Sequence, residues 1–358
     1  MRLIVGISGA SGVIMGYYML KVLKQIPDLE VHLIVTEGAI KNFECETDIA
    51  LKDVIALADY NHSNKNMAAS ISSGSFKTDG MINKEFIKNQ IVQAVEAVKK
   101  TNPMVGSITN SVTINLVANA QLAVGGAAAM VYLPDEGEFL AKAAGATYIN
   151  VGTLLPIYEE TLPRTAKALC NAEKPWVLDP VAVGIGKLRT KLLRQFKEYK
   201  PSVIKGNASE IIALAGLWNL EGGIEESKVR GVDSTDTVIT ARKAAVELAK
   251  WTGGAVFVSG ETDLITDGSL VAFSHGGSHL FEKITGAGCS LGGVVAVYLS
   301  VASPFIASLT AAAVYNLAGK RAEDKVEGPG HFQSQFLDEL YKATAEEIAD
   351  NKFEIEEE

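Results

Sequence analysis

The sequence predicts an α/β protein built around a mostly parallel sheet that is flanked by helices. From residue 81 to about residue 332, short apolar runs that fit buried strands alternate with longer segments of helical periodicity. Hydrophobic residues make up 47% of the 358 residues, which is enough for a large core and unlike the composition of a disordered chain. A chain of this length is typical of about two domains.

Charge and cysteine content exclude several classes of protein. The 33 Lys and Arg residues are outnumbered by 42 Asp and Glu, which argues against a nucleic-acid-binding protein that relies on a basic surface. The cysteines Cys45, Cys170 and Cys289 lie far apart and lack the spacing of a zinc site. We therefore expect no disulfide framework and a location in the reducing cytoplasm.

No segment is predicted to enter a membrane. The apolar run at residues 3–5 is too short for a signal peptide. No charge occurs between Lys283 and Lys320, but Gly292-Gly293 and Ser303-Pro304 interrupt this stretch. We predict two buried helices with a break at Pro304.

The first 81 residues carry alternating strand and helix signals. Residues 3–5 and 31–35 are apolar runs that predict strands, and residues 11–26 between them predict a helix that ends before Pro27. Asp48 is the expected N-cap of a short helix that runs to Leu57. The polar, serine-rich residues 61–79 predict an ordered loop or a linker.

The second part of the chain begins with an amphipathic helix. Ile87, Ile91, Val95 and Val98 follow the helical period, and Asn102-Pro103 ends the helix. The remaining predicted elements include strands at residues 148–151, 176–178, 203–204 and 255–258, and a helix at residues 237–251. Residues 346–358 carry seven acids and one Lys, and their end is expected to fray.

Polar residues directly follow the predicted strands. They are Thr153, Asp179, the run from Lys205 to Asn207, and the run from Ser259 to Glu261. Because ligands of such folds bind at the carboxyl ends of the strands, we expect the chemistry of the protein at this edge of the sheet.

The string Gly6-Ile-Ser-Gly-Ala-Ser-Gly12 follows a predicted strand and opens a helix. Such a loop can bind a phosphate, but an ordinary glycine-rich turn has the same pattern. Together with Ser70-Ile-Ser-Ser-Gly-Ser-Phe-Lys-Thr-Asp-Gly80 it resembles the flavin prenyltransferase family, which attaches a dimethylallyl group to reduced FMN. The residues that the resemblance implies to face FMN are Gly9, Ala10, Ser11 and Thr36.

This resemblance ends near Met81. The next strand of that family and its Pro-Cys-Ser-Met-Lys-Thr loop should follow, but Ile82-Asn-Lys-Glu-Phe86 begins a different pattern. Two strands and their helices cannot bury both faces of a sheet unaided. We expect an incomplete flavodoxin-like or Rossmann-type half-domain without prenyltransferase activity, and FMN binding by it stays open.

A second glycine-rich string, Thr285-Gly-Ala-Gly-Cys289, precedes an uncharged segment predicted to be helical. Three consecutive N–H groups at a helix start can form an anion hole for a γ-phosphate, and a tight turn that packs the helix on the sheet is the alternative. A P-loop is excluded because Gly186-Lys187-Leu188 lacks the earlier glycine and the Ser or Thr of that motif.

Two carboxylates near strand ends are candidate magnesium ligands. Asn207 and Glu210 lie three residues apart, so their side chains either face Mg²⁺ together or form the capping box of a helix. Asp179 ends a buried strand, where it either joins the water shell of Mg²⁺ or caps the turn that follows.

Together these strings resemble the ribokinase-like superfamily and, within it, the hydroxyethylthiazole kinase family of thiamine salvage. The resemblance covers residues 84 to 345 and divides the chain into a fragment at 1–81, a kinase domain at 82–345 and an acidic tail at 346–358. The matching strings are Ile108-Thr-Asn-Ser-Val112, Asn115, Ala118-Asn119, Asn150-Val-Gly-Thr153, Asp179-Pro-Val-Ala-Val-Gly184, Gly206-Asn-Ala-Ser-Glu210, Arg230-Gly-Val-Asp-Ser234, Gly286-Ala-Gly-Cys289 and Glu327-Gly-Pro-Gly330.

The resemblance implies that the protein uses ATP and Mg²⁺ to phosphorylate the hydroxyl of 4-methyl-5-(2-hydroxyethyl)thiazole. Members of the family are trimers with sites between subunits, so a homotrimer is expected. The implied site residues are Met130, Gly286 and Asn110 for the thiazole alcohol, Lys205, Ser259 and Asn207 for ATP, Asp179 and Glu210 for Mg²⁺, and Gly286, Ala287, Gly288 and Cys289 for catalysis.

The sequence departs from the family pattern at four places. Lys205 stands where the family usually has Arg, so a bidentate phosphate contact becomes a single ammonium. Ser259 replaces a Thr. Gly126-Ala-Ala128 replaces Ala-Ser-Pro, and Gly106 stands where a His is common, which alters the wall of the expected thiazole pocket.

Cys289 occupies the place where many relatives in the superfamily carry an Asp base. Its thiol either acts as a weak base or only lines the pocket, since a free thiol is largely protonated at neutral pH. Two other functions stay open: a kinase for another small alcohol such as hydroxymethylpyrimidine, and a flavin-binding or assembly module whose kinase is vestigial.

Overall fold

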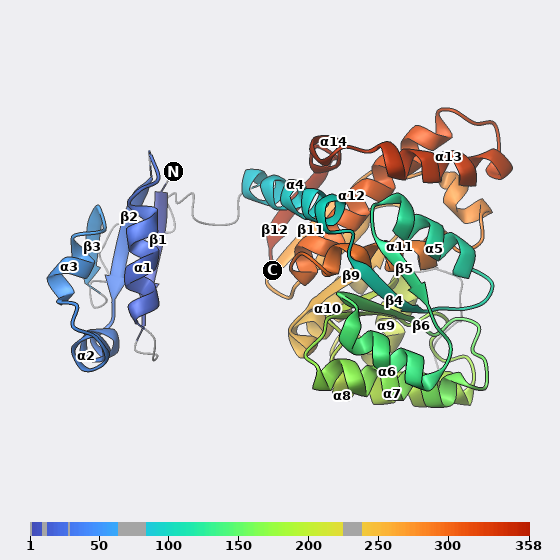
Figure 1. Ribbon diagram of the computed structural model, residues 1–358, viewed down its shortest axis with the longest axis horizontal. Helices are drawn as coiled ribbons and strands as arrows, with labels where there is room; N and C mark the ends of the chain where they lie inside the picture. Colours follow the sequence, from blue (N-terminus) through green and yellow to red (C-terminus); the bar gives the residue numbers. More distant parts are fainter. Residues whose placement is uncertain (1, 9–12, 28, 64–83, 225–237) are drawn as a thin grey trace. The chain divides into compact units, whose positions relative to one another are not determined.

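The computed structural model describes residues 2–8, 13–27, 29–63, 84–224 and 238–358 (Figure 1). The chain divides into two units, Met1–Phe86 and Ile87–Glu358, each with its own sheet and hydrophobic core. The boundary predicted between residues 81 and 82 lies outside the described ranges.

The first unit contains a parallel sheet with the strand order β1-β2-β3 among its described residues. Its elements are β1 (Arg2–Ile7), α1 (Ile14–Leu23), β2 (Glu30–Val35), α2 (Glu37–Glu46), α3 (Leu51–Ile55) and β3 (Tyr60–Ser63). Val5, Leu20, Leu33 and Phe43 are fully or almost fully buried in its core. The two predicted strands and the helix between them are confirmed.

For this unit, one helix is missing from the prediction and two predictions are wrong. Helix α2 is absent from the prediction because its polar sequence buries only Ala39 and Phe43. Helix α3 begins after Ala50, and Asp48 does not cap it. Residues 61–63 belong to strand β3, which pairs with β2, although their polar side chains predict a loop.

Among the described residues, the second unit forms a nine-stranded sheet in the order β12-β11-β10-β9-β8-β7-β6-β4-β5. The six strands from β4 to β9 run parallel to one another. The pairs β9-β10, β10-β11 and β11-β12 are each antiparallel. The strands are β4 (Met104–Ile108), β5 (Ala127–Met130), β6 (Ala146–Asn150), β7 (Trp176–Asp179), β8 (Val203–Asn207), β9 (Ala255–Ser259), β10 (Asp263–Thr266), β11 (Leu270–Ser274) and β12 (Phe353–Glu357).

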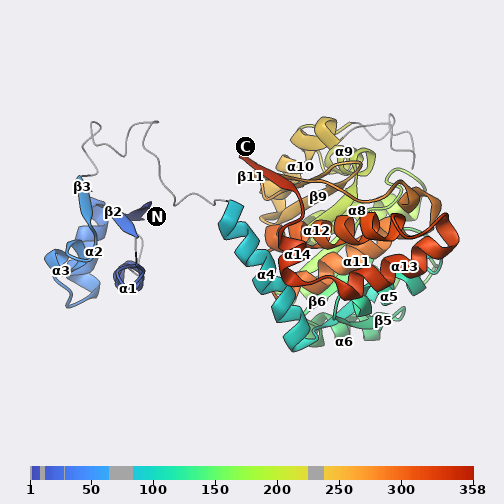
Figure 2. The same cartoon turned by 90° about the horizontal axis from the view of Figure 1, so that it is seen from above.

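Helices cover both faces of this sheet (Figures 1 and 2). The central parallel strands are buried on both faces, which explains the apolar runs at residues 176–178 and 255–258. One core lies under α4 (Lys84–Thr101), α5 (Ile114–Ala123), α11 (Ala287–Leu299), α12 (Pro304–Glu323), α13 (Pro329–Lys342) and α14 (Ala345–Ala349). The other lies under α6 (Pro134–Ala143), α7 (Tyr158–Asn171), α8 (Lys187–Tyr199), α9 (Ala208–Leu217) and α10 (Val238–Thr252).

The uncharged stretch before Lys320 forms two buried helices, as predicted. Helix α11 ends at Leu299, and Pro304 is the first residue of α12, where its missing N–H costs no hydrogen bond. Among the described helices, none combines the length and apolar character that a membrane crossing requires.

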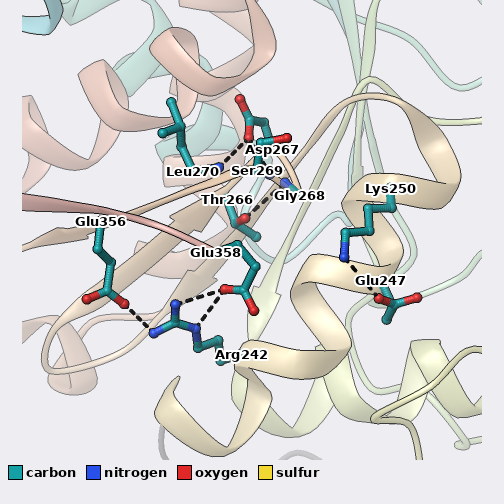
Figure 3. Close-up of polar contacts among 10 residues, drawn as sticks. All are labelled: Arg242, Glu247, Lys250, Thr266, Asp267, Gly268, Ser269, Leu270, Glu356 and Glu358. Atoms are coloured by element: carbon teal, nitrogen blue, oxygen red, sulfur yellow. Dashed lines mark hydrogen bonds and ion pairs between the residues drawn. The ribbon is translucent and has the colours of Figure 1, made fainter. Parts of the chain in front are cut away.

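The prediction that the acidic C-terminus frays is wrong. Strand β12 pairs antiparallel with β11, and Phe353 at its start is buried. Figure 3 shows Arg242 of α10 between Glu356 and Glu358. Nε of Arg242 donates to Oε2 of Glu358 at 2.9 Å. The apolar alternation of Phe353 and Ile355 and this ion pairing offset the repulsion among the acids, so the tail completes the sheet.

Candidate active site

Five charged or polar groups gather where the parallel strands β6, β7 and β8 end. Asn150 and Asp179 are register partners at the ends of β6 and β7, and Lys205 lies near the end of β8. The carboxylates of Asp179 and Glu210 and the thiol of Cys289 interact electrostatically with the Lys205 ammonium. The structure therefore brings the sequence-predicted residues Asp179, Lys205, Glu210 and Cys289 together at the expected edge of the sheet.

Asp179 presents one unpaired oxygen at this edge. Its Oδ2 accepts hydrogen bonds from the hydroxyl of Tyr148 at 2.8 Å and from Nδ2 of Asn150 at 3.0 Å. Its Oδ1 is buried and has no hydrogen-bond partner among the described residues. Burial raises the pKa of Asp179, and the nearby Lys205 ammonium partly opposes this shift. A buried carboxylate oxygen without a partner fits a bound cation.

Glu210 is the acidic member of a capping box at the start of α9. Its Oε2 accepts from the backbone N–H of Asn207 at 2.9 Å, while Oδ1 of Asn207 accepts from the N–H of Glu210 at 2.9 Å. Its Oε1 accepts from the N–H of Ala182 at 3.1 Å. Burial and the negative charge of Asp179 raise the pKa of Glu210. The capping alternative is thus confirmed, and each oxygen retains a lone pair for a further contact.

Lys205 is buried next to the start of α11. Burial by itself would lower the pKa of Lys205, but the carboxylates of Asp179 and Glu210 raise it, so the ammonium stays charged. A Cβ built on Gly288 would lie 3.2 Å from Nζ of Lys205. The positive charge therefore lies against the first turn of the helix.

Helix α11 offers free backbone donors beside this ammonium. Gly286 is its N-cap with φ +94°, a left-handed conformation that suits glycine, and Thr113 packs against it. The N–H groups in the first turn of a helix have no partner within the helix. Together with Lys205, the N–H groups at 287–289 have the charge and the donors that could bind a phosphate.

Cys289 in this first turn is held by two amides. Nδ2 of Asn150 lies 3.3 Å and Nδ2 of Asn110 3.7 Å from its Sγ. Burial and the charge of Asp179 raise the pKa of the Cys289 thiol, so the thiol is protonated at neutral pH. The environment favours a lining role over that of a base.

A pocket of about 350 Å³ opens beside the Cys289 thiol. Its walls are mostly apolar, with Asn110 and Thr113 as polar groups near the thiol. The lining residues are Asn110, Val112, Thr113, Gly152, Thr153, Val181, Ala182, Ile185, Arg189 and Cys289. Two residues that the family resemblance implies for substrate binding, Met130 and Gly286, do not line this pocket. Met130 ends β5 and packs against the hydrophobic core. Gly286 packs against the side chain of Thr113.

Arg189 on α8 donates hydrogen bonds to the loops that follow β6 and β7 around this pocket. Its guanidinium donates to the carbonyl oxygen of Val151 at 2.8 Å, to that of Ile185 at 2.5 Å and to that of Gly152. Sequence reasoning missed Arg189, Tyr148 and the side chain of Asn150. Asn150 carried a signal, because it is a polar residue at the end of a buried strand, whereas Tyr148 and Arg189 did not.

Two of the three implied ATP residues, Asn207 at the end of β8 and Ser259 at the end of β9, lie side by side. Asn207 and Ser259 are register partners in the sheet. The hydroxyl of Ser259 donates to the carbonyl oxygen of Gly206 at 3.4 Å. Both side chains therefore lie at the same edge as Lys205.

The donor set fits a magnesium ion that is shared with a nucleotide. In the described part of the chain, no three His, Cys, Asp or Glu side chains are arranged to hold a metal by themselves. Mg²⁺ in kinases is commonly bound by one or two carboxylates together with phosphate oxygens. Asp179, with its free oxygen, and Glu210 match that pattern.

The implied FMN residues lie in the first unit. Gly9, Ala10 and Ser11 lie outside the described residues. The Thr36 hydroxyl accepts from the N–H of Ala39 at 3.3 Å as the N-cap of α2. Contact of these residues with FMN stays a prediction.

Comparison with known proteins decides the family. The model of the hydroxyethylthiazole kinase family matches residues 95–346. The chain belongs to the hydroxyethylthiazole kinase family. The match to this family spans Asp179, Lys205, Glu210 and Cys289, whereas residues 1–94 lie outside it.

Relatives in the hydroxyethylthiazole kinase family support the assignment along most of their length. A hydroxyethylthiazole kinase from Bifidobacterium longum (strain DJO10A) is 50% identical over 288 residues, which cover 75% of this chain and 92% of the relative. One from Brachyspira hyodysenteriae is 39% identical over 264 residues, covering 74% and 97%. The structure of a hydroxyethylthiazole kinase protein from Pyrococcus horikoshii OT3 superposes with a TM-score of 0.65 at 30% identity, covering 75% of this chain and 98% of that one.

Proposed function

We propose that this protein transfers the γ-phosphoryl group of ATP to the hydroxyl of 4-methyl-5-(2-hydroxyethyl)thiazole, in the supply of thiamine. One observation carries the proposal within the family assignment: the Lys205 ammonium and the first turn of α11 adjoin a carboxylate with a free oxygen, beside a mostly apolar pocket. Phosphoryl transfer needs these elements, because positioning and charge neutralisation do most of the work.

The anion hole and Lys205 act on the transferred phosphoryl group. The N–H groups of Ala287, Gly288 and Cys289 would donate to its oxygens, and the Lys205 ammonium adds a full positive charge nearby. Lys205 and Ser259, with Asn207 next to them, are the proposed ATP contacts. Because these donors are fixed by the helix and the sheet, they need no rearrangement as charge develops.

Asp179 and Glu210 are the proposed holders of Mg²⁺. Oδ1 of Asp179 is free to face the ion directly or through water, and Glu210 supplies a second negative charge. When bound, Mg²⁺ neutralises charge on the β- and γ-phosphates. The two buried carboxylates and the single ammonium carry a net negative charge that a cation offsets.

The pocket beside Cys289 is the proposed site of the alcohol. Val112, Val181 and Ile185 suit an apolar heterocycle, and the Asn110 amide lies near the thiol where the hydroxyl would approach. Met130 and Gly286 are further proposed substrate contacts. Cys289 serves as a lining residue, since its protonated thiol cannot accept a proton at neutral pH.

The test is an assay of ATP consumption by the full-length protein with each alcohol in turn. We expect turnover with the hydroxyethylthiazole and turnover at least tenfold lower with hydroxymethylpyrimidine. The Asp179→Asn variant should lose most activity, whereas Asn171→Asp, on the exposed end of α7, should retain it. Preferred turnover of the pyrimidine, or none with either alcohol, would overturn the proposal.

A homotrimer in the cytoplasm is part of the same proposal. The three cysteines are free in the structure, which suits a reducing compartment. Light scattering of the full-length protein tests the trimer, and a mass of one or two chains would contradict it.

A further inference from the structure

The side chain of Asn150 lies between the two halves of the proposed site. We infer that Asn150 is a positioning residue that aims Asp179 at the cation and ties this carboxylate to the start of α11. The inference rests on the proposed kinase reaction. Asn150 is fully buried at the end of β6, next to Asp179 on β7 and across from Cys289 on α11.

The orientation of the Asn150 amide is fixed by its neighbours. Its Oδ1 accepts from the backbone N–H of Gly152 at 2.9 Å and from Nδ2 of Asn110 at 3.1 Å. A backbone N–H can only donate, so the oxygen of the amide must face Gly152. The NH₂ group therefore faces the opposite way, toward Asp179 and Cys289.

This NH₂ group fixes which oxygen of Asp179 stays free. Nδ2 of Asn150 donates to Oδ2 of Asp179 at 3.0 Å, and the Tyr148 hydroxyl donates to the same oxygen at 2.8 Å. Both donors bind one oxygen, so Oδ1 is left without a partner among the described residues. Rotation of the carboxylate would break both bonds inside a buried site, which holds Oδ1 toward the ligand.

The same amide reaches the anion hole. Nδ2 of Asn150 lies 3.3 Å from Sγ of Cys289 and 2.9 Å from the Tyr148 oxygen. The two hydrogens of this NH₂ group are thus shared among three acceptors: Asp179, Tyr148 and Cys289. One side chain thus links the carboxylate proposed to face the cation with the helix proposed to face the phosphate.

A merely structural role for Asn150 predicts a different result. A buried amide that only fills the core would affect folding and leave the response to Mg²⁺ unchanged. An outer residue that orients a metal ligand instead changes metal affinity, commonly by about 10- to 100-fold. The informative measurement is therefore the dependence of nucleotide binding on Mg²⁺.

The test uses Asn150→Leu, which keeps the branched outline of the side chain and removes its donors and its acceptor, and Tyr148→Phe, which removes only the hydroxyl. Asn171→Leu is the matched control at an exposed position. Binding of a non-hydrolysable ATP analogue is measured by calorimetry with Mg²⁺ and with a chelator, and melting temperatures report folding. Kinetics in Mg²⁺ give kcat and KM for the alcohol.

We expect the parent to bind the analogue more tightly with Mg²⁺. In Asn150→Leu, the gain in analogue affinity on adding Mg²⁺ should be about tenfold or more smaller than in the parent. Its affinity for the analogue in chelator should be unchanged. Its kcat should be lower, and its KM for the alcohol should stay within twofold of the parent. In Tyr148→Phe, the gain in analogue affinity on adding Mg²⁺ should be about threefold smaller than in the parent. If Asn150→Leu does not fold, Tyr148→Phe is the variant that tests whether the donors to Asp179 Oδ2 matter for this gain. An unchanged Mg²⁺ gain in the folded variants would overturn the inference. A parent that neither binds the analogue nor phosphorylates the alcohol would instead refute the proposed function.

Discussion

The Lys205 ammonium lies against Gly288, so close that a Cβ on this glycine would stand 3.2 Å from Nζ. A side chain from the end of β8 thus adds its charge to the first turn of α11. The buried carboxylates of Asp179 and Glu210 keep the pKa of Lys205 raised despite its burial. The charge that we propose to contact the phosphate is therefore held in place by the protein itself.

Replacing Lys205 by Met should lower kcat/KM about 100-fold or more, because the anion hole loses its full positive charge. The substitution also leaves two buried carboxylates uncompensated, which should cost about 3 kcal/mol or more of stability. Lys205→Arg should retain most of the stability because it keeps the charge. Steady-state kinetics and urea unfolding measure both effects. Activity of the Met variant within threefold of the parent would contradict this role.

Replacing Cys289 by Ala should leave kcat within about threefold of the parent. Burial and the charge of Asp179 raise the pKa of the Cys289 thiol, so the parent carries no thiolate at neutral pH that the variant would lack. Cys289→Asp should be slower, since it adds a carboxylate near Asp179. The measurement is kcat from pH 6 to 9. A loss of 100-fold in the Ala variant would indicate that the thiol takes part in proton transfer.

Replacing Ala182 by Gly should stabilise the protein by about 0.5–1 kcal/mol. Ala182 has φ +61°, and this left-handed conformation costs a non-glycine residue about 1–2 kcal/mol, which exceeds the entropy cost of glycine. The N–H of residue 182 still donates to Glu210, so activity should persist. Chemical denaturation measures the change, and a destabilised variant would contradict the assigned strain.

Replacing Asp263 by Asn should change how stability depends on pH. Burial raises the pKa of Asp263 to about 6 from its ordinary 3.8. The folded parent then binds more protons than the unfolded chain between these values, so its stability falls as the pH rises from about 4 to 6. Over this pH range, the free energy of unfolding of the parent should fall by about 3 kcal/mol relative to that of Asp263→Asn. Parallel stability curves for the two proteins would show that Asp263 titrates normally.

Replacing Phe353 by Ala should destabilise the second unit by about 3–5 kcal/mol, because this fully buried ring fills the core under α14. Glu357→Ala, an exposed change on the same strand, should cost far less. Thermal unfolding of the full-length protein compares the two. Equal melting temperatures would indicate a frayed tail.

The parallel core of the fold could be predicted from sequence, whereas the C-terminal strand could not. Continuous apolar runs such as residues 176–178 and 255–258 predict strands that lie within a sheet covered on both faces. Strand β12 carries only Phe353 and Ile355 as apolar residues, and its acids dominate its composition. Arg242, more than 100 positions earlier, supplies the ion pairs, and no local pattern reveals that partner.

The candidate site shows the same division. Asp179, Glu210 and Cys289 lie in recognisable strings, and the structure brings them together. Tyr148 resembles an ordinary core residue in an apolar strand, and only the register of β6 and β7 brings its hydroxyl to Asp179. The free oxygen of Asp179 follows from which donors occupy the other one, and that is a property of three-dimensional packing.

Strand β12 also has a consequence for association between molecules. It forms an edge of the large sheet and pairs with β11 along five residue pairs. If β12 detached, the backbone groups on that side of β11 would be open to pairing with another chain, because an uncovered strand edge is a template for further strands. The exposed acids Glu354, Glu356 and Glu357 place negative charge along the edge that β12 itself presents, and such charge opposes the addition of another strand there.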